Sequence, residues 1–226
     1  MNKTWKEGVD TKTYPITYMN YNTINHGLCE GVVVGKVFSP NEDIAIFTVR
    51  VRDYRIRPNT QKQTISYIQF TAFDDLAKKI SEEDREDCLV FLTYEITTSK
   101  KTDENGVTKF YKNRIVKSFE IFDKPEDKHL IPYINTGYAQ GGFVSIKKAT
   151  KSTGIYFLTI KLTMNDGLKE KIYYPQFTVY GDKFASLFEK YNVDDVISVE
   201  YKIETEKKII DGSEEFFTDY IVTEIK

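Results

Sequence analysis

The stretch YIQFTAFDDLA at residues 67–77 decides how the rest of the chain is interpreted. Its first seven residues alternate, with Ile68, Phe70 and Ala72 on one face of a strand and polar or aromatic residues on the other. The alternation then gives way to DDLAKKI, an acidic start followed by apolar residues at helical spacing. The sequence therefore predicts a half-buried strand that runs directly into a short helix.

The same pattern occurs a second time at residues 174–185, YPQFTVYGDKFA, with Phe177 and Val179 on the expected inner face. The correspondence covers both halves of the chain. Residues 31–48 match 142–159 at an offset of 111, residues 94–101 match 201–208 at 107, and residues 115–116 match 221–222 at 106. A period of this length is not that of a solenoid repeat. The sequence predicts two copies of one domain.

The composition fits two small domains rich in strands. Hydrophobic residues make up 40% of the 226 residues, enough for a core in each of two domains of about 100 residues. The 16 Tyr and 15 Phe residues favour strands. No apolar run is long enough for a transmembrane helix, and the N-terminal residues lack the apolar segment of a signal peptide. We expect a cytoplasmic protein that does not associate with membranes.

The two cysteines, Cys29 and Cys88, predict neither a disulfide nor a metal site. They lack CxxC spacing, and only His26 and His129 could join them as ligands. No Gly-rich phosphate loop, nucleophile elbow or HExxH motif occurs. The carboxylates at residues 74–84 decorate one helix and are typical of a solvated face. We expect no cofactor and no enzymatic activity.

The order of elements within each copy predicts an OB-fold barrel. A helix between the third and fourth of five strands is the order of that fold, although an SH3-like or other small barrel also has five short strands. In the first copy the strands are expected at residues 28–38, 44–53, 67–73, 89–98 and 110–119, with loops at 53–64 and 99–109. In the second copy they are expected at 142–149, 156–164, 171–180, 196–205 and 215–225, with a helix at 182–191.

The predicted fold class is mainly β, with two tandem five-stranded OB-fold barrels at residues 28–122 and 141–226. Residues 1–27 match nothing in the second copy and contain Trp5, Tyr14, Tyr18 and Tyr21. They form either a flexible tail or an arm that packs on a neighbouring subunit and supports self-association. Residues 123–140, with two prolines and a glycine, are expected to link the barrels.

The outer face of the second and third strands in the first copy combines cations with aromatics. Bases offer a π-face for stacking and phosphates offer charge, so such a strip suits single-stranded nucleic acid. Alternatively, Tyr67 and Phe73 are cross-strand pairs covered by a loop or by a dimer interface. The binding residues predicted on this strip and its flanking loop are Arg50, Arg52, Tyr54, Arg55, Arg57, Tyr67, Gln69 and Phe73.

The second copy has the aromatics of this strip but fewer cations, so the first copy is expected to dominate binding. Both copies carry a lysine pair before the loop between strands four and five, either as a solvated face or beside the groove of an OB barrel. The net charge of −2 is low for a nucleic-acid binder, so only local clustering can supply a positive surface. The binding residues predicted here are Lys161, Tyr174, Gln176 and Tyr180, with the pairs Lys100, Lys101, Lys207 and Lys208.

The aromatic-x5-aromatic strand, turn and alanine helix resemble the single-stranded DNA-binding protein (SSB) family of bacteria and their phages. The resemblance implies that Tyr67 and Phe73, and likewise Tyr174 and Tyr180, stack on bases. The pair formed by Tyr180 and Gly181 fits the family's aromatic–glycine turn, and Asp74 replaces that glycine in the first copy. Two barrels, and an end without an acidic tail, make the chain more similar to a phage or plasmid SSB.

This resemblance implies that the partner is single-stranded DNA, or alternatively RNA, bound without strong sequence specificity. The setting would be replication, recombination or DNA transfer in a bacterial host cytoplasm. The competing hypothesis is a non-catalytic protein-interaction module, in which tandem small barrels bind protein in a structural or host-inhibitory role. The near-neutral charge favours this alternative, and the repeated strip of cations and aromatics opposes it.

Overall fold

Eleven strands and one helix build the described part of the chain, which comprises residues 23–57, 60–83, 88–102, 104, 106–123, 134–150, 152–165, 169–181, 189–210 and 213–226 of a computed structural model. For residues 53–57, 60–64, 109, 210 and 213–215 only the backbone is described. Residues 1–22 of the expected arm, including its four aromatics, lie outside the described residues.

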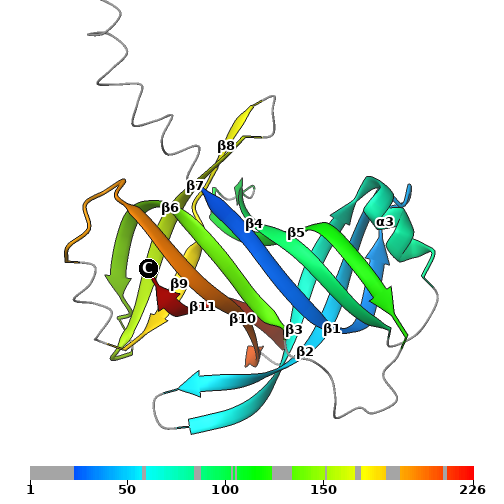
Figure 1. Ribbon diagram of the computed structural model, residues 1–226, viewed down its shortest axis with the longest axis horizontal. Helices are drawn as coiled ribbons and strands as arrows, with labels where there is room; N and C mark the ends of the chain where they lie inside the picture. Colours follow the sequence, from blue (N-terminus) through cyan, green and yellow to red (C-terminus); the bar gives the residue numbers. More distant parts are fainter. Residues whose placement is uncertain are drawn as a thin grey trace, which may run out of the picture.

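The first five strands close into a barrel, here called barrel one (Figure 1). They pair in the order β1-β2-β3-β5-β4-β1, and the β3–β5 pairing is parallel, at Thr71 and Ile115. Helix α3 (Asp74–Ser81) follows β3 and buries Ala77 and Ile80. The strands are β1 (Ile24–Phe38), β2 (Ile44–Arg57), β3 (Thr60–Phe73), β4 (Leu89–Thr102) and β5 (Thr108–Phe122).

Barrel two repeats this order as β6-β7-β9-β11-β10-β6, again with one parallel pairing, between β9 and β11. Two OB-fold barrels therefore form this mainly β chain, as the sequence predicts. The helix expected at 182–191 falls largely on residues 182–188, which lie outside the described residues. The strands are β6 (Asn135–Lys148), β7 (Ile155–Asn165), β9 (Gln176–Tyr180), β10 (Val196–Ile210) and β11 (Ser213–Ile225), with β8 (Glu170–Tyr173) paired to β7.

The registers of the two barrels confirm the repeat and correct it in one strand. Gln69 lies opposite Thr48 in barrel one, and Gln176 lies opposite Thr159 in barrel two, as the offsets of 107 and 111 require. In the first strand, however, the structural offset is 110. A Cβ on Gly31 would lie 2.6 Å from the Arg50 carbonyl oxygen, and one on Gly141 would lie 2.2 Å from that of Lys161. Gly141 is therefore the counterpart of Gly31, where the sequence analysis had placed Gly142.

Two hairpins are longer than the sequence predicts. The expected loop at residues 53–64 is mostly paired strand, with Asp53 opposite Thr64 and Arg57 opposite Thr60. The expected loop at 99–109 is likewise largely paired, because β4 continues to Thr102 and β5 begins at Thr108. Both segments project as ribbons beyond the closed barrel, so neither face carries the apolar alternation by which a half-buried strand is predicted.

The two barrels are joined by a ladder between the first halves of β1 and β6, which run side by side in Figure 1. Both strands therefore begin before the expected barrel boundaries at residues 28 and 141. The ladder pairs Gly27 with Gly137, and each glycine also lies opposite a tyrosine of its own barrel, Tyr94 or Tyr201. Both tyrosine rings are fully buried, and burial raises the pKa of each phenol, so both stay neutral.

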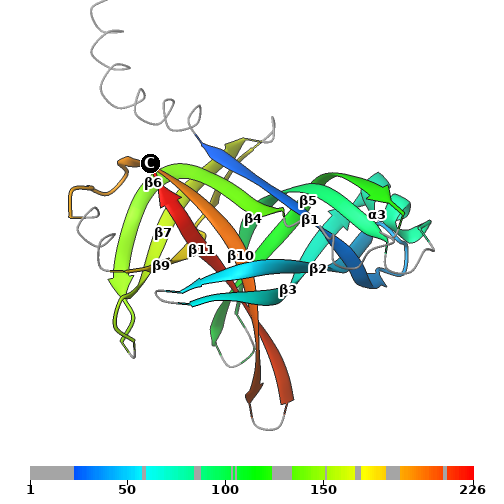
Figure 2. The same cartoon turned by 60° about the horizontal axis from the view of Figure 1, so that its bottom comes forward.

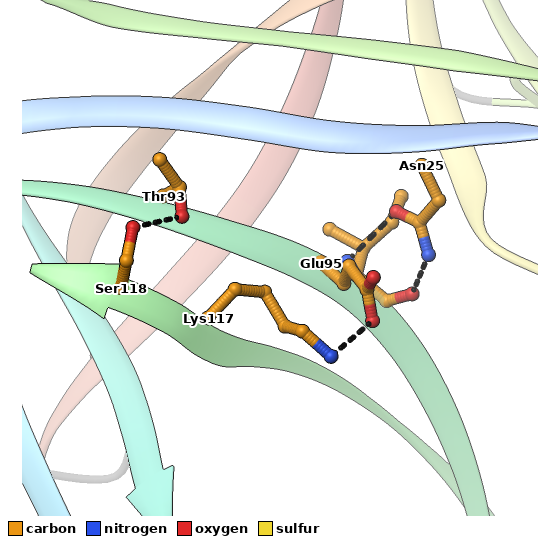
Figure 3. A network of polar contacts seen from close by, with 6 residues as sticks. Asn25, Thr93, Glu95, Lys117 and Ser118 are labelled. Atoms are coloured by element: carbon orange, nitrogen blue, oxygen red, sulfur yellow. Dashed lines mark hydrogen bonds and ion pairs between the residues drawn. The ribbon is translucent and has the colours of Figure 1, made fainter. Parts of the chain in front are cut away.

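An asparagine at the start of each of these strands ties it to the neighbouring strand. The Asn25 amide donates to the Ile96 carbonyl at 2.7 Å, and its side-chain oxygen accepts from the Ile96 N–H at 2.9 Å (Figure 3). Asn135 makes the equivalent pair with Ile203, at 2.7 and 3.0 Å. The β1–β4 ladder ends at Gly27 and the β6–β10 ladder ends at Gly137, so each asparagine amide satisfies backbone groups that these ladders leave unpaired.

The alternation read from the sequence agrees with burial in the core. Ile68, Phe70 and Ala72 are fully buried, and so are Ala45, Phe47, Val49 and Val51 on β2. One apolar cluster includes the buried residues of both barrels, and Tyr94 and Tyr201 both belong to it. The middle of the outer surface of β4 and β5 carries polar contacts, a Thr93–Ser118 hydrogen bond of 2.7 Å and a Lys117–Glu95 ion pair of 3.3 Å (Figure 3).

The turn into the helix confirms one detail of the sequence analysis. Gly181 has a φ of 96°, and Asp74, which replaces glycine at this turn of barrel one, has a φ of 51°. A positive φ strains residues with a Cβ, although Asp tolerates it better than most.

We expect Asp74→Ala to lower the free energy of unfolding by about 1 kcal/mol, because alanine meets the same strain without the acidic charge that favours a helix N-terminus. Asp74→Gly should differ from wild type by less than about 0.5 kcal/mol, because relief of strain offsets the lost charge. Urea unfolding of the three proteins measures the difference. Equal stability of the alanine and glycine variants would contradict this account of the turn.

Candidate nucleic-acid interface

The predicted strip on barrel one forms along the outer face of β2 and β3. Arg50 lies directly opposite Tyr67 in the ladder, and Phe73 lies opposite Ile44 near the helix. Tyr67 and Phe73 are each 40% exposed on the outer face, and Ile68, Phe70 and Ala72 between them are fully buried on the inner face. Six residues of strand separate the two rings by roughly 20 Å. The strip is therefore long enough for several nucleotides, with one aromatic towards each end.

The other residues predicted on this strip differ in exposure, and for three of them only the backbone is described. Arg52 is half-buried opposite Ile65, and Gln69 is exposed, with its carbonyl oxygen 2.6 Å from the Arg114 Nε that donates to it. The backbone of Tyr54, Arg55 and Arg57 continues β2 into the projecting hairpin, and their side chains lie outside the described residues.

Barrel two presents its aromatics differently from barrel one. Tyr174 is 51% exposed beside exposed Gln176, but Tyr180 is only half-exposed. The Lys161 ammonium forms an ion pair with Asp194, with its nitrogen 3.6 Å from a carboxylate oxygen. Thr178, expected on the outer face, is buried at 4% exposure. The exposed part of the face is therefore the end that carries Tyr174.

Both predicted lysine pairs lie on projecting hairpins. Hairpin one comprises residues 98–112 of β4 and β5, and hairpin two comprises residues 205–218 of β10 and β11. Lys100 and Lys101 are exposed on the first, and Lys207 and Lys208 on the second. The Lys208 ammonium lies 3.5 Å from a Glu206 carboxylate oxygen and 5.1 Å from the Phe217 ring centre. The ammonium of Lys208 is thus partly neutralised.

Each aromatic face meets the hairpin of the other barrel. The Tyr67 N–H donates to the Thr205 hydroxyl at 2.7 Å, and the Tyr174 N–H donates to the Thr98 hydroxyl at 3.1 Å. These contacts are equivalent under the repeat. The Tyr67 ring also packs edge-on against Phe216, with ring centres 6.4 Å apart. Figure 2 shows the β2–β3 hairpin of barrel one reaching across to β10 and β11.

A pair of equivalent residues fixes this arrangement from inside. Arg114 and Tyr220 correspond at the offset of 106, and they meet between the barrels, with Arg114 Nη1 donating to the Tyr220 hydroxyl at 3.4 Å. The Lys112 ammonium lies 5.2 Å from the centre of the same Tyr220 ring, and burial lowers the pKa of Lys112. The equivalent positions 114 and 220 therefore hold different side chains, the donor and the acceptor of one hydrogen bond between the barrels.

The hairpins contain aromatics that the sequence analysis did not assign to a site. Phe110 is 75% exposed and Tyr111 is 44% exposed, and their counterparts Phe216 and Phe217 are exposed on hairpin two. A signal was present, because adjacent aromatics recur at 110–111 and 216–217 at the offset of 106. It could not be assigned, since only the packing of one barrel on the other brings these rings to the aromatic face of the other barrel.

Within the described ranges, no three histidine, cysteine or acidic side chains gather closely enough to hold a metal ion. No helix in those ranges combines the length and the apolarity needed to cross a bilayer. Cys29 and Cys88 are buried free thiols, and burial raises the pKa of the Cys29 thiol.

The fold of the whole chain is similar to that of known single-stranded DNA-binding proteins. The wild-type protein from Thermus aquaticus aligns over 91% of this chain and 93% of its own, with a TM-score of 0.64 at 10% identity. A deletion mutant of that protein aligns over 91% and 95%, with a TM-score of 0.65 at 10% identity. No family model and no curated protein sequence matches the chain. At this identity the similarity supports the OB-fold architecture.

Proposed function

We propose that the chain binds single-stranded DNA through the outer faces of its two barrels, without strong sequence preference. The observation that carries this proposal is the strip of barrel one. There Tyr67 and Phe73 are each 40% exposed on a strand whose alternate residues are fully buried, and Arg50 lies opposite Tyr67. The Thermus aquaticus proteins of similar fold are single-stranded DNA-binding proteins, which adds support.

Stacking on bases and contacts to phosphates come from different side chains in this proposal. Bases stack on the exposed rings, whereas the arginines of β2 and the lysines of the hairpins hold phosphates. A duplex hides its base faces within the stack, so this surface discriminates against it. Such a protein protects single strands during replication, recombination or transfer, and it acts as a binding protein rather than an enzyme.

Titration of labelled oligo-dT against the matched duplex at one low salt concentration tests the proposal. We expect the single strand to bind at least tenfold more tightly, because stacking contributes about 1–3 kcal/mol per base. A ribo-oligonucleotide in the same titration measures the preference for DNA over RNA. Equal affinity for single strand and duplex would contradict the proposal, and no binding at all would favour a protein-interaction module.

The salt dependence of the same titration tests the role of the cations. With roughly four to six cations on phosphates, log affinity should fall with log salt at a slope of about −3 to −4, since each phosphate contact contributes about −0.7 for single strands. The cations concerned are Arg50, Arg52, Lys100, Lys101, Lys207 and Lys208. A slope near zero would show that these side chains do not contact phosphate.

A further inference from the structure

A groove of about 560 Å³ lies between hairpin one and the outer face of barrel two. Phe110 and Tyr111 line it from barrel one, and Ile172 and Tyr174 line it from barrel two. Its volume is within the range of small-ligand sites. The hydrogen bond from Tyr174 to Thr98 crosses the junction and holds the two walls together.

The lining of the groove has the chemistry of a nucleotide site. Two lysines, Lys100 and Lys112, belong to it, and no carboxylate occurs among its described lining residues. Phe110 is 75% exposed, so this ring does not contribute to a core, and Tyr174 is 51% exposed. Exposed aromatic rings on both walls, with cations beside them, match the flat face of a base and the charge of its phosphate.

We propose that this groove is a composite site in which one single strand is held by both barrels at once. Bases stack against Tyr174 of barrel two and against Phe110 and Tyr111 of barrel one, while Lys100 and Lys112 hold the phosphates. The proposal rests on the proposed function of the chain and assigns it a second binding element. Barrel two, whose own face is poor in cations, obtains them from the hairpin of barrel one.

The repeat distinguishes this groove from its counterpart. The equivalent positions around Tyr67 are Thr205, Lys207, Phe216 and Phe217, so aromatics and one lysine are common to both. Lys112 corresponds to Thr218, however, and Ser99 corresponds to Glu206. The hairpin wall at Tyr174 therefore carries one lysine more and one carboxylate fewer than the hairpin wall at Tyr67. At Tyr67 the nearby cations are instead Arg50 and Arg52 on the β2 strand of barrel one itself.

Substitution of the hairpin aromatics tests the composite site. In the full chain, Phe110→Ala combined with Tyr111→Ala should weaken oligo-dT binding by about 5- to 150-fold, the equivalent of about 1–3 kcal/mol of stacking. The melting temperature should change less than the affinity, because Phe110 is 75% exposed and Tyr111 is 44% exposed. Phe122→Ala is the matched control, since Phe122 is 44% exposed on the same strand but lies outside this groove, and it should bind as wild type does.

Photocrosslinking gives a second measurement that does not depend on the variants folding. Oligo-dT carrying 5-iododeoxyuridine, irradiated on the wild-type protein, should form adducts on Tyr174 and on Phe110 or Tyr111, identified by mass spectrometry. Adducts on Tyr174 without adducts on the hairpin would overturn the composite site, as would wild-type affinity in the hairpin variant. If the wild-type protein fails to bind oligo-dT, the proposed function itself is wrong.

Discussion

Substituting Gly137 by alanine should lower the stability of the whole molecule, although alanine normally suits a strand better than glycine does. A Cβ at Gly137 would lie 2.1 Å from Tyr201 Cζ, and one at Gly27 would lie 2.1 Å from Tyr94 Cζ. Non-bonded carbons prefer separations of about 3.5–4.0 Å, so the buried ring must move or the pairing of the glycine's strand with the tyrosine's strand must open. Overpacking of this kind costs about 1–3 kcal/mol and occasionally more.

The melting temperature of each alanine variant measures this cost. For a protein of this size, about 1–3 kcal/mol corresponds to a fall of roughly 2–12 °C. Gly35→Ala is the matched control, because nothing lies within 4 Å of the Cβ position at Gly35, and its melting temperature should stay near that of wild type. Tyr94→Leu should partly rescue Gly27→Ala by making room. Strictly additive effects of these two substitutions would show that steric contact is not the cause.

Removing both rings of the barrel-one strip should cause the largest loss of DNA affinity. Tyr67→Ala with Phe73→Ala deletes the exposed aromatics at the two ends of the strip, and each stacked base is worth about 1–3 kcal/mol. We expect binding of oligo-dT to weaken by at least about tenfold. The melting temperature should fall as well, because each ring is only 40% exposed and Tyr67 loses its edge contact with Phe216, so affinities are compared well below the melting transition.

A control for this prediction is Tyr138→Ala. Tyr138 is 39% exposed, but it lies on β6 in the ladder between the barrels, opposite His26. The control should bind oligo-dT as wild type does. If the double variant binds equally well, the exposed rings of β3 serve packing against the other barrel, and the cations alone cannot account for a preference for single strands.

Elements whose pattern is dictated by local burial could be predicted from the sequence. The alternation around Phe70 and its repetition around Phe177 predicted the strand, its inner face and the duplication. The hairpin extensions could not be predicted, because their residues show no apolar alternation in the sequence. The offset in the first strand was wrong because Gly141 and Gly142 are adjacent, and only the close approach to the Lys161 carbonyl shows which of them matches Gly31.

The candidate site was predicted in part for a related reason. A strand pattern shows which residues face outwards, and it identified Arg50 and Tyr67 as neighbours on one face. It carries no information about what the other barrel brings to that face. Phe110 and Tyr111 were therefore assigned to the start of a strand, although they line the groove beside Tyr174. The same alternation placed Thr178 on the outer face, but Thr178 is buried.

The ladder between β1 and β6 has a consequence for binding at low protein concentration. If the barrels were separate chains, this joint would obey mass action and come apart on dilution. Here both strands belong to one chain, with twelve residues between Phe122 and Asn135, so the second barrel stays at a high effective concentration. A groove shared by the two barrels is thus complete before any strand arrives, and its occupancy depends on the concentration of DNA without a prior assembly step.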